Sequence, residues 1–385
     1  MSRSILPIVA APMIALAASP ALAVDETFET QGPAIRVQTV AEGLDHPWGL
    51  AFLPDGSMLV TERPGTLRHV TAAGEVSEPI TNVPEVDARG QGGLLDVTLD
   101  PDFTENRLVY VSYAEEGEGG NGTAVARGVL AADNAALGQV EVIFRQQPKV
   151  DSTAHFGSRL VFDGQGHVYV TLGERSDSEF REQAQDLNSH LGKIVRLEPD
   201  GSVPADNPFV GQDGARPEIW SLGNRNVQAA AINPETGVLW EIEHGPRGGD
   251  ELNVIEPGAN YGWPVVSLGI NYIGTPVGSG EASAPGMVDS IYHWTPVIAP
   301  SGMMFYGGAA FPAWQGNLFV GGLKSTALVR LELDGDSVTH EERLLEDLDL
   351  RIRDVAEGPD GAIYVITDEG DGEILRIAPA EGTEG

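Results

Sequence analysis

The strongest constraint on the fold is a sequence unit that recurs six times along the 385 residues. Each copy combines an apolar strand, a turn built on Pro-Asp-Gly or Asp-Gly, a β-branched strand and a further strand after glycine. Apolar and polar residues alternate in the strands, and helical periodicity is almost absent. Such a repeat predicts a radial array of small antiparallel sheets. The copies occupy residues 49–70, 93–114, 158–174, 229–246, 302–323 and 355–377.

We therefore predict an all-β fold, a six-bladed β-propeller of four-stranded antiparallel sheets. The 48 glycines and 26 prolines supply the many turns that this fold needs. A doubly wound α/β domain would require long amphipathic helices between strands, whereas the intervals here are rich in Gly, Pro, Asp and Asn. No linker is evident, so residues 24–385 are expected to form a single domain, with frayed ends at 24–34 and 378–385.

The first 23 residues have the pattern of a secretory signal peptide. Arg3 supplies the positive end, an apolar run follows, and Ala21-Leu22-Ala23 is a small-x-small cleavage site. A membrane anchor is the weaker alternative, because Pro7 and Pro12 interrupt a run that is short for a bilayer span. We expect cleavage after Ala23 and a mature periplasmic protein without a membrane span.

Charge and cysteine content exclude several classes of function. The formal net charge is -34, and such an acidic surface repels phosphate backbones and anionic lipids, so binding of nucleic acid is not expected. Cysteine is absent, which removes disulfides, thiolate nucleophiles and zinc-thiolate sites. Any metal ion must therefore be bound by oxygen or histidine ligands.

Candidate functional residues lie at strand ends and turns, which converge at one end of a propeller. His155 precedes a strand and could act as a general base, while Glu174 could orient its imidazole. Arg225 and Asn226 suit recognition of a carbonyl or carboxylate, and Gln91 follows a glycine-rich turn. The alternatives are a structural histidine, a solvated glutamate and ordinary turns.

Residues 243–264 form the densest segment of candidate ligands in the chain. The backbone carbonyls of residues 244–246 and of Tyr261, with the carboxylates of Asp250 and Glu251, make an oxygen-rich set. Calcium prefers such hard ligands and tolerates irregular geometry. The alternative is an elaborate loop held together by its own hydrogen bonds.

Three cations near the C-terminus form a further candidate group, Lys324, Arg351 and Arg353. The two arginines are two residues apart and would lie on one face of a strand. Converging cations are costly to leave unpaired. Either a polyanionic ligand neutralises them or the nearby acidic residues do, namely Asp347, Asp349 and Asp354.

Taken together, these residues resemble the glucose/sorbosone dehydrogenase family of sugar dehydrogenases that depend on pyrroloquinoline quinone (PQQ), and most of all its soluble periplasmic aldose sugar dehydrogenase branch. The resemblance covers roughly residues 35–377 and rests on nine motifs in order. They are LDHPWGLAFLPDG, GQGGLLD, HFGSRLVF, LGNRN, EHGPRGGDELN, NYGWP, VIAPSGM, GGLKS and RIRDV.

The resemblance implies a six-bladed propeller that binds PQQ and calcium at the channel mouth and oxidises the anomeric hydroxyl of aldose sugars to lactones. It implies that His155 is the base, that Glu174 orients it and that Arg225 stabilises the developing oxyanion. It further implies that Gln91, Asn226 and Tyr272 contact the cofactor and that Lys324, Arg351 and Arg353 neutralise its three carboxylates. One calcium would be bound by the Gly245 and Pro246 carbonyls, and a second, structural one by Glu251 and the Tyr261 carbonyl.

Four positions depart from the pattern of the classical soluble glucose dehydrogenases of that family. Ala154 and Val297 replace an aspartate and a threonine, Glu174 replaces an aspartate, and His244 replaces a glutamine. We therefore expect a broad range of aldoses. No haem attachment motif exists, so a separate electron acceptor is expected, and the enzyme is expected to be a monomer or weak homodimer.

Two other functions stay open at this point. A calcium-dependent lactonase-type propeller hydrolase would require several Asp, Asn and Glu side chains around a central calcium, and the three cations would then lack a ligand. A non-catalytic secreted propeller that binds a partner at its mouth is the other alternative.

Overall fold

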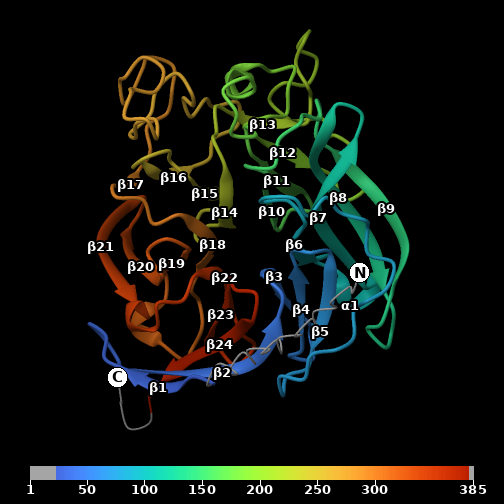
Figure 1. Ribbon diagram of the computed structural model, residues 1–385, viewed down its shortest axis with the longest axis vertical. Helices are drawn as coiled ribbons and strands as arrows, with labels where there is room; N and C mark the ends of the chain where they lie inside the picture. The colour runs from blue at the N-terminus through green and yellow to red at the C-terminus, as the bar shows by residue number, and fades with distance from the viewer. Residues whose placement is uncertain (1–22, 381–385) are drawn as a thin grey trace, which may run out of the picture.

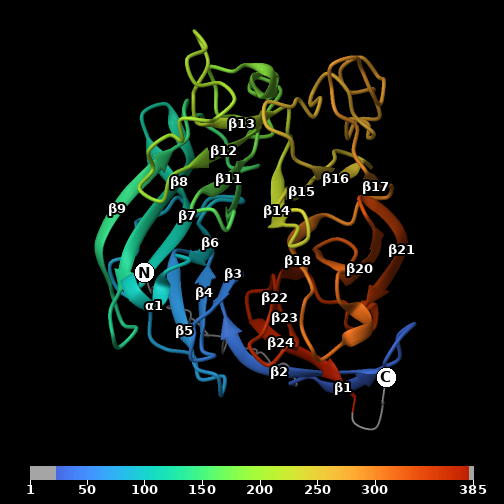
Figure 2. The ribbon, with the colours of Figure 1, turned by 180° about the vertical axis from the view of Figure 1, so that it is seen from behind.

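The recurring units form six antiparallel sheets around one axis in the computed structural model, which describes residues 23–380 (Figures 1 and 2). The prediction of an all-β six-bladed propeller is confirmed. Each blade places its first strand nearest the axis, and the first strands of neighbouring blades contact one another (Figure 1). These innermost strands are β3 (Pro47–Phe52), β6 (Leu94–Leu99), β10 (Gly157–Phe162), β14 (Val227–Ile232), β18 (Pro300–Phe305) and β22 (Ile352–Glu357).

Four of the blades are four-stranded meanders in chain order. Beyond their innermost strands, the second blade contains β7 (Leu108–Gly117), β8 (Gly120–Leu130) and β9 (Leu137–Arg145), and the third contains β11 (Val168–Leu172), β12 (Lys193–Leu197) and β13 (Ile219–Leu222). The fourth continues with β15 (Leu239–Glu243), β16 (Asp250–Val254) and β17 (Tyr292–Trp294), and the fifth with β19 (Leu318–Gly322), β20 (Ala327–Asp334) and β21 (Ser337–Leu344).

The first and last blades differ from this count because the N-terminal strands join the last blade. The first blade has three strands, β3, β4 (Met58–Glu62) and β5 (Thr66–Val70). The last combines β22, β23 (Ile363–Thr367) and β24 (Gly372–Pro379) with β2 (Ile35–Leu44) and β1 (Asp25–Phe28), and β2 pairs antiparallel with β24. The ring is therefore closed by strands from both ends of the chain.

This closure corrects the expectation of frayed ends, because β1 pairs with β2 and β24 extends to Pro379. The signal peptide predicted for residues 1–23 lies, except for Ala23, outside the described residues, and the assignment of residues 24–385 to one domain stays a prediction. The helices are single turns, α1 (Phe103–Asn106), η1 (Arg181–Gln185), η2 (Pro312–Trp314) and η3 (Glu346–Leu348). Within residues 23–380, no helix is long and apolar enough to cross a bilayer.

The hydrophobic core lies between the blades. Side chains alternate along a strand, so each sheet presents one apolar face to the blade before it and one to the blade after it. In β4, Leu59 packs with Val97 and Val111 of the second blade, whereas Met58 and Val60 pack with the last blade. Six such clusters of buried residues, one per pair of neighbouring blades, account for the alternation seen in the sequence.

Three charged side chains meet at the axis of the ring, and we call them the axial triad: Asp96, Arg159 and Asp354. Arg159 Nη1 lies 2.8 Å from Asp96 Oδ1 and 3.2 Å from Asp354 Oδ2, and all three residues are buried. The two carboxylates also accept backbone hydrogen bonds from Leu160 and Leu50. The triad therefore links the innermost strands of the second, third and sixth blades. Breaking such a buried ion group by removing one partner costs about 3–5 kcal/mol.

Glycine at neighbouring innermost strands makes room for the triad. A Cβ on Gly49 would lie 2.8 Å from Asp96 Oδ1, and a Cβ on Gly302 would overlap Asp354 Oδ1. The innermost strand of each blade also shifts its pairing register near its start, as at Ser158-Arg159 in β10. Such irregularities re-aim side chains, here toward the axis.

Hydroxyl groups on second strands join consecutive blades near the axis. Thr61, Ser112 and Thr171 each accept a hydrogen bond from the innermost strand of their own blade. Each then donates to a backbone carbonyl of the next blade, at Leu95, Ser158 and Val227 respectively. These bonds satisfy backbone groups that the irregular pairing would leave buried without partners.

The packing at the axis predicts that Gly302→Ala is strongly destabilising. The new methyl group would displace the Asp354 carboxylate from Arg159, so we expect the free energy of unfolding to fall by about 3 kcal/mol. Gly307→Ala is the matched control, because a Cβ there would approach no closer than 3.8 Å to Glu357 Oε2. Urea unfolding of both variants measures the difference, and equal stabilities would contradict the role given to Gly302.

Candidate active site

A cavity of about 200 Å³ lies at the axis, and every blade contributes to its wall. Most of its lining residues are at the ends of strands or in the loops that follow them. They include Trp48 and Arg63 of the first blade, Gln91, His155, Arg225, Asn226, Gln228, His244, Gly245 and Tyr272, followed by Leu323, Arg351, Arg353 and Asp368 of the last two blades.

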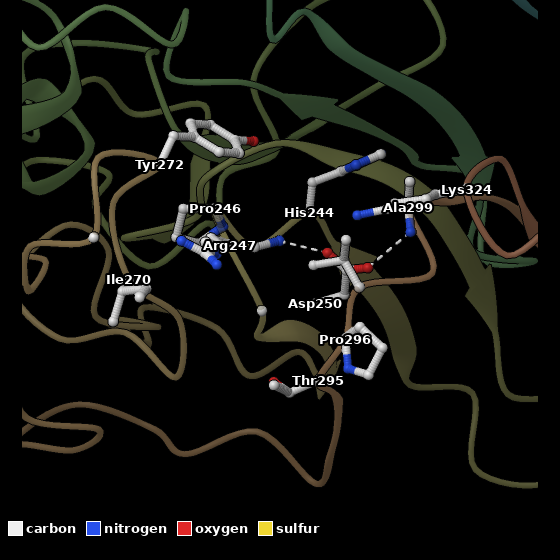
Figure 3. Close-up of a pocket in the computed structure, with 14 residues that line it drawn as sticks. His244, Pro246, Arg247, Asp250, Ile270, Tyr272, Thr295, Pro296, Ala299 and Lys324 are labelled. Carbon is white, nitrogen blue, oxygen red and sulfur yellow. Dashed lines mark hydrogen bonds between the residues drawn. The ribbon is translucent and has the colours of Figure 1, made fainter.

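A larger cavity of about 1130 Å³ adjoins the first and shares His244, Gly245 and Tyr272 with it. Pro246, Arg247 and Lys324 contribute to its wall (Figure 3). Val297 also lines it. Tyr272, between the two cavities, is 71% exposed.

The two cavities bring together most of the residues singled out from the sequence. Glu174 does not line either one but lies buried directly behind His155. Glu251 and Tyr261 lie elsewhere, in a third cavity of about 240 Å³ with Asp289 and His293. The remaining predicted residues line the smaller cavity, the larger one or both: Gln91, His155, Arg225, Asn226, Gly245, Pro246, Tyr272, Lys324, Arg351 and Arg353.

His155 and Glu174 form a buried hydrogen-bonded pair. His155 Nδ1 lies 2.6 Å from Glu174 Oε2, and the backbone N–H of Ser176 donates to the same oxygen. Because the carboxylate accepts a hydrogen bond from Nδ1–H, a neutral imidazole presents the lone pair of its Nε2 to the cavity. The Gln91 side-chain oxygen accepts the backbone N–H of His155 at 2.8 Å, which fixes the backbone of His155.

Burial and neighbouring charges keep the imidazole neutral and the carboxylate ionised. Burial lowers the pKa of His155 below its ordinary value, although Glu174 opposes this effect. Burial alone would raise the pKa of Glu174, but His155 and Arg225 outweigh it and the pKa is lowered. The arrangement is that of a general base near neutral pH with a third group holding its tautomer.

Arg225 lies next to this pair. Its Nη1 donates to the carbonyls of His244 and Gly245 at 2.7 and 2.9 Å, and its guanidinium lies over the Trp263 ring. Its Nε and the Glu174 Oε1 are 4.0 Å apart, and both are buried without a hydrogen-bond partner among residues 23–380. The side-chain oxygen of Asn226 accepts a hydrogen bond from the backbone N–H of Gly157 at 3.0 Å.

Two cations of the site, Arg351 and Arg353, share a carboxylate that the sequence did not single out. Asp368 Oδ2 lies 2.7 Å from Arg351 Nη2 and 2.6 Å from Arg353 Nη2. Burial alone would raise the pKa of Asp368, but Arg353 and Arg351 lower it to about 2. Asp368 is the only acidic residue that lines the smaller cavity within the described chain.

The acidic neighbours considered for this role are not the partners. Asp354 bonds to Arg159 instead, and Asp347 and Asp349 form no ion pair with the two arginines within residues 23–380. Arg353 lines the smaller cavity, while Asp354 bonds to Arg159 within the axial triad. The Arg353 Nε has no partner, and within residues 23–380 the Lys324 ammonium has neither a hydrogen bond nor an ion pair.

The oxygen-rich segment is used in part by the protein itself. Asp250 accepts the backbone N–H groups of Gly245, Ile298 and Ala299, two of which Figure 3 shows as dashed lines, so it is not available as a calcium ligand. The Gly245 carbonyl accepts a hydrogen bond from Arg225 Nη1, whereas the carbonyls of Pro246 and Tyr261 receive no hydrogen bond from the described residues.

Of the four departures from the family pattern, Glu174 is described above with His155, and the other three lie in different places. Ala154 offers its carbonyl to Arg175, and Val297 lines the larger cavity. His244 Nε2 lies 3.2 Å from Gln228 Oε1, and burial lowers the pKa of His244 well below its ordinary value.

Five residues of the smaller cavity were not singled out from the sequence, Trp48, Arg63, Gln228, Leu323 and Asp368. Trp48 and Leu323 carried a usable signal, because they lie within the motifs LDHPWGLAFLPDG and GGLKS. The Trp48 ring is 4.6 Å from the Arg159 guanidinium, so it connects the cavity to the axial triad.

Comparisons with known proteins agree with this geometry. Residues 44–376 match the family model described as Glucose / Sorbosone dehydrogenase. The chain is 48% identical over 349 residues to aldose sugar dehydrogenase YliI of Escherichia coli, covering 90% of this chain and 93% of that protein.

Solved structures give the same result. The apo form of the soluble aldose sugar dehydrogenase of Escherichia coli superposes with a TM-score of 0.87 at 47% identity, covering 90% of this chain and all of that one. The PQQ-bound aldose sugar dehydrogenase of Streptomyces coelicolor superposes with a TM-score of 0.74 at 30% identity, covering 94% and 99%. The chain belongs to the glucose/sorbosone dehydrogenase family.

Proposed function

We propose that this protein is a PQQ- and calcium-dependent oxidoreductase that converts the anomeric hydroxyl of aldose sugars to a lactone. The observation that carries the proposal is the His155–Glu174 pair, whose free imidazole nitrogen faces a cavity lined by cations. The relatives of this chain include aldose sugar dehydrogenases, one of which was solved with PQQ bound.

The residues of the two cavities fit a cofactor with three carboxylates. Four arginines line the smaller cavity against the single carboxylate of Asp368 among the described residues, and Lys324 and Arg247 line the larger cavity with Asp250. The Nε atoms of Arg225 and Arg353 are buried without a hydrogen-bond partner in the described chain, a state that costs free energy until a ligand accepts them. Lys324, Arg351 and Arg353 would hold the carboxylates, and Gln91, Asn226, Arg225 and Tyr272 would contact the rings.

Two cation sites are proposed on carbonyl and carboxylate oxygens. The Pro246 carbonyl, free of hydrogen bonds, and the Gly245 carbonyl would bind calcium beside the cofactor. Glu251 and the Tyr261 carbonyl would bind a second, structural calcium in the third cavity. Burial raises the pKa of the Glu251 carboxyl to about 7, as expected for a buried acid without a cation beside it.

The chemistry of this cofactor, when bound with calcium, is acceptance of a hydride at a quinone carbonyl that the metal polarises. His155 Nε2 removes the proton of the anomeric hydroxyl, so that the C1 hydrogen leaves with its electron pair and a C1 carbonyl forms. Glu174 stabilises the imidazolium that results. Arg225, fixed by two carbonyls, donates to the oxygen on which negative charge develops.

The remaining parts of the proposal concern the setting of the enzyme. The N-terminal sequence supports export to the periplasm, and the lack of a haem motif supports a separate electron acceptor. A monomer or weak homodimer is proposed. A lactonase-type site has no support, since the only carboxylate lining the smaller cavity, within the described residues, is bound to two arginines.

The proposed function predicts activity only after reconstitution. Purified mature protein would be assayed for dye-linked oxidation of glucose, galactose, xylose and maltose, with calcium, with PQQ and with both. We expect turnover only with both, accompanied by visible absorbance of bound quinone. Inactivity in every combination without such absorbance would contradict the proposal, and lactone hydrolysis would then be assayed.

The base assignment predicts a kinetic and a pH effect. His155→Asn should lower kcat by about 10²–10⁴-fold while PQQ still binds. Because burial lowers the pKa of His155, kcat/KM of the native enzyme should stay constant from neutral pH to below about 6.5 and decline only at more acidic pH.

His167→Asn is the matched control for this variant. His167 in the same blade also pairs through Nδ1 with a carboxylate, Asp163 Oδ2 at 2.7 Å, and it lines neither cavity. Its rate should match that of the native enzyme. A His155→Asn variant that keeps most of its rate would remove His155 from the base role.

The cation set predicts weaker cofactor binding when Lys324 is replaced. Lys324→Met should raise the Kd for PQQ by about 10–100-fold, the usual value of a charge-assisted hydrogen bond. Lys149→Met changes net charge equally, but its ammonium pairs with Glu115 away from both cavities. Equilibrium dialysis of the two apo proteins against PQQ makes the comparison, and equal Kd values would exclude Lys324 from the cofactor site.

A further inference from the structure

Arg175 is a buried cation that the mechanism above does not use. It directly follows Glu174, it has no exposed surface, and its guanidinium lies 3.8 Å from the centre of the Phe156 ring. All four of its hydrogen bonds go to uncharged oxygens of other segments. Burial lowers its pKa to about 10, so the guanidinium remains charged at neutral pH.

These hydrogen bonds tie together two segments near the cavity. The Nε donates to the Ala154 carbonyl at 2.9 Å, and Nη2 donates to the Ser152 carbonyl and to Asn121 Oδ1, both at 2.7 Å. Nη1 donates to the Asn121 carbonyl at 3.1 Å. In return, the Ser152 hydroxyl donates to the Arg175 carbonyl at 2.6 Å.

The segment held in this way carries the proposed base. His155 lies between Ala154, which accepts a hydrogen bond from Arg175, and Phe156, on which Arg175 stacks. Its φ of 51° is in the left-handed region, an unfavourable conformation for a residue with a side chain. Such a backbone persists only where its surroundings hold it. Arg175 also has a positive φ, 72°, which turns its side chain back under this segment.

The network extends to the second loop that contacts His155. Asn121 Nδ2 donates to Asp87 Oδ2 at 2.7 Å, and Asp87 binds Arg89 through two hydrogen bonds of 2.8 and 2.6 Å. Two residues later, Gln91 accepts the backbone N–H of His155. One continuous set of polar contacts therefore fixes both loops that place the base.

We propose that Arg175 is the positioning residue of the active site, holding residues 152–156 so that His155 Nε2 faces the cavity with its Nδ1 on Glu174. The proposal rests on the proposed function, which assigns His155 as the base. Arg175 lines neither cavity, so in this proposal it does not contact substrate or cofactor.

The variant Arg175→Lys tests the geometry of the guanidinium donors and not the charge. A lysine ammonium keeps the charge, but it cannot present the planar set of donors that reaches Asn121, Ser152 and Ala154 together. Misplacing a catalytic group by about 1 Å can cost roughly 10²-fold in rate. Arg175→Lys should therefore lower kcat by about 10–100-fold and leave the Kd for PQQ of the apo protein within about twofold.

Arg196→Lys is the matched control. Arg196 lies in the same blade, its guanidinium is 4.2 Å from the Trp220 ring, and its Nε donates to Asn207 Oδ1 at 2.8 Å. It lines neither cavity. If both variants lose kcat equally, or if Arg175→Lys loses rate only in proportion to its unfolded fraction, the positioning role is overturned.

A second readout does not depend on activity. Four groups around His155 influence its titration: Glu174 after β11, Arg225 before β14, His244 after β15 and Arg175 itself. In the apo protein, the ¹⁵N-histidine NMR signal of His155, assigned from its loss in His155→Asn, should titrate at higher pH in Arg175→Met, because a neighbouring cation is removed. It should also depart from the native titration in Arg175→Lys, which keeps the cation but loses the donor set that holds the segment. A native His155 titration in Arg175→Lys would overturn the proposal.

These measurements separate the two hypotheses. If the reconstituted enzyme oxidises no aldose, the proposed function fails, while the His155 titration still tests the hold of Arg175. If Arg175→Met does not fold, Asn121→Ala removes one side-chain acceptor and leaves the guanidinium in place. Its kcat should fall between those of Arg175→Lys and the native enzyme, and a native kcat would contradict the network.

Discussion

The structure depends on the buried ion group at its axis. A propeller brings six innermost strands together where no apolar layer can form, and here Arg159 joins two of them to its own through Asp96 and Asp354. Trp48 lies over Arg159 and lines the smaller cavity, so the axial triad also supports that cavity. The cost of removing these three charges from water is offset only when geometry and hydrogen bonds are complete, which explains the glycines and the hydroxyl links around the triad.

Adjacent residues near the cavity contact different parts of the structure. Arg353 faces the cavity and Asp354 the axial triad, while Glu174 holds His155 and Arg175 holds the segment that carries it. A single strand end therefore serves both stability and chemistry. The site needs little local structure of its own, because the six strand ends already converge.

The sixfold repeat made the fold predictable, because the spacing of turns and the alternation of apolar residues are local features of the sequence that identify strands and turns. His155 and the cations were recognisable because few residue types perform their chemistry. Asp368 was not, because its approach to Arg351 and Arg353 depends on the register of β22 against β23, which pairs Ile352 with Thr367, whereas the closer Asp354 bonds to Arg159. The use of Asp250 on backbone amides was equally hidden, because a carboxylate in a loop has the same sequence signature as a metal ligand.

The strand pairing that closes the ring determines when the site can exist. Arg351, Arg353 and Asp368 belong to the blade in which β2, near the N-terminal end of the described chain, pairs with β24, near its C-terminal end. That pairing spans almost the whole described chain, so its loop-closure entropy must be paid before the contact stabilises the fold. The blade that carries these three cavity residues is therefore complete only when strands from both ends of the described chain have paired.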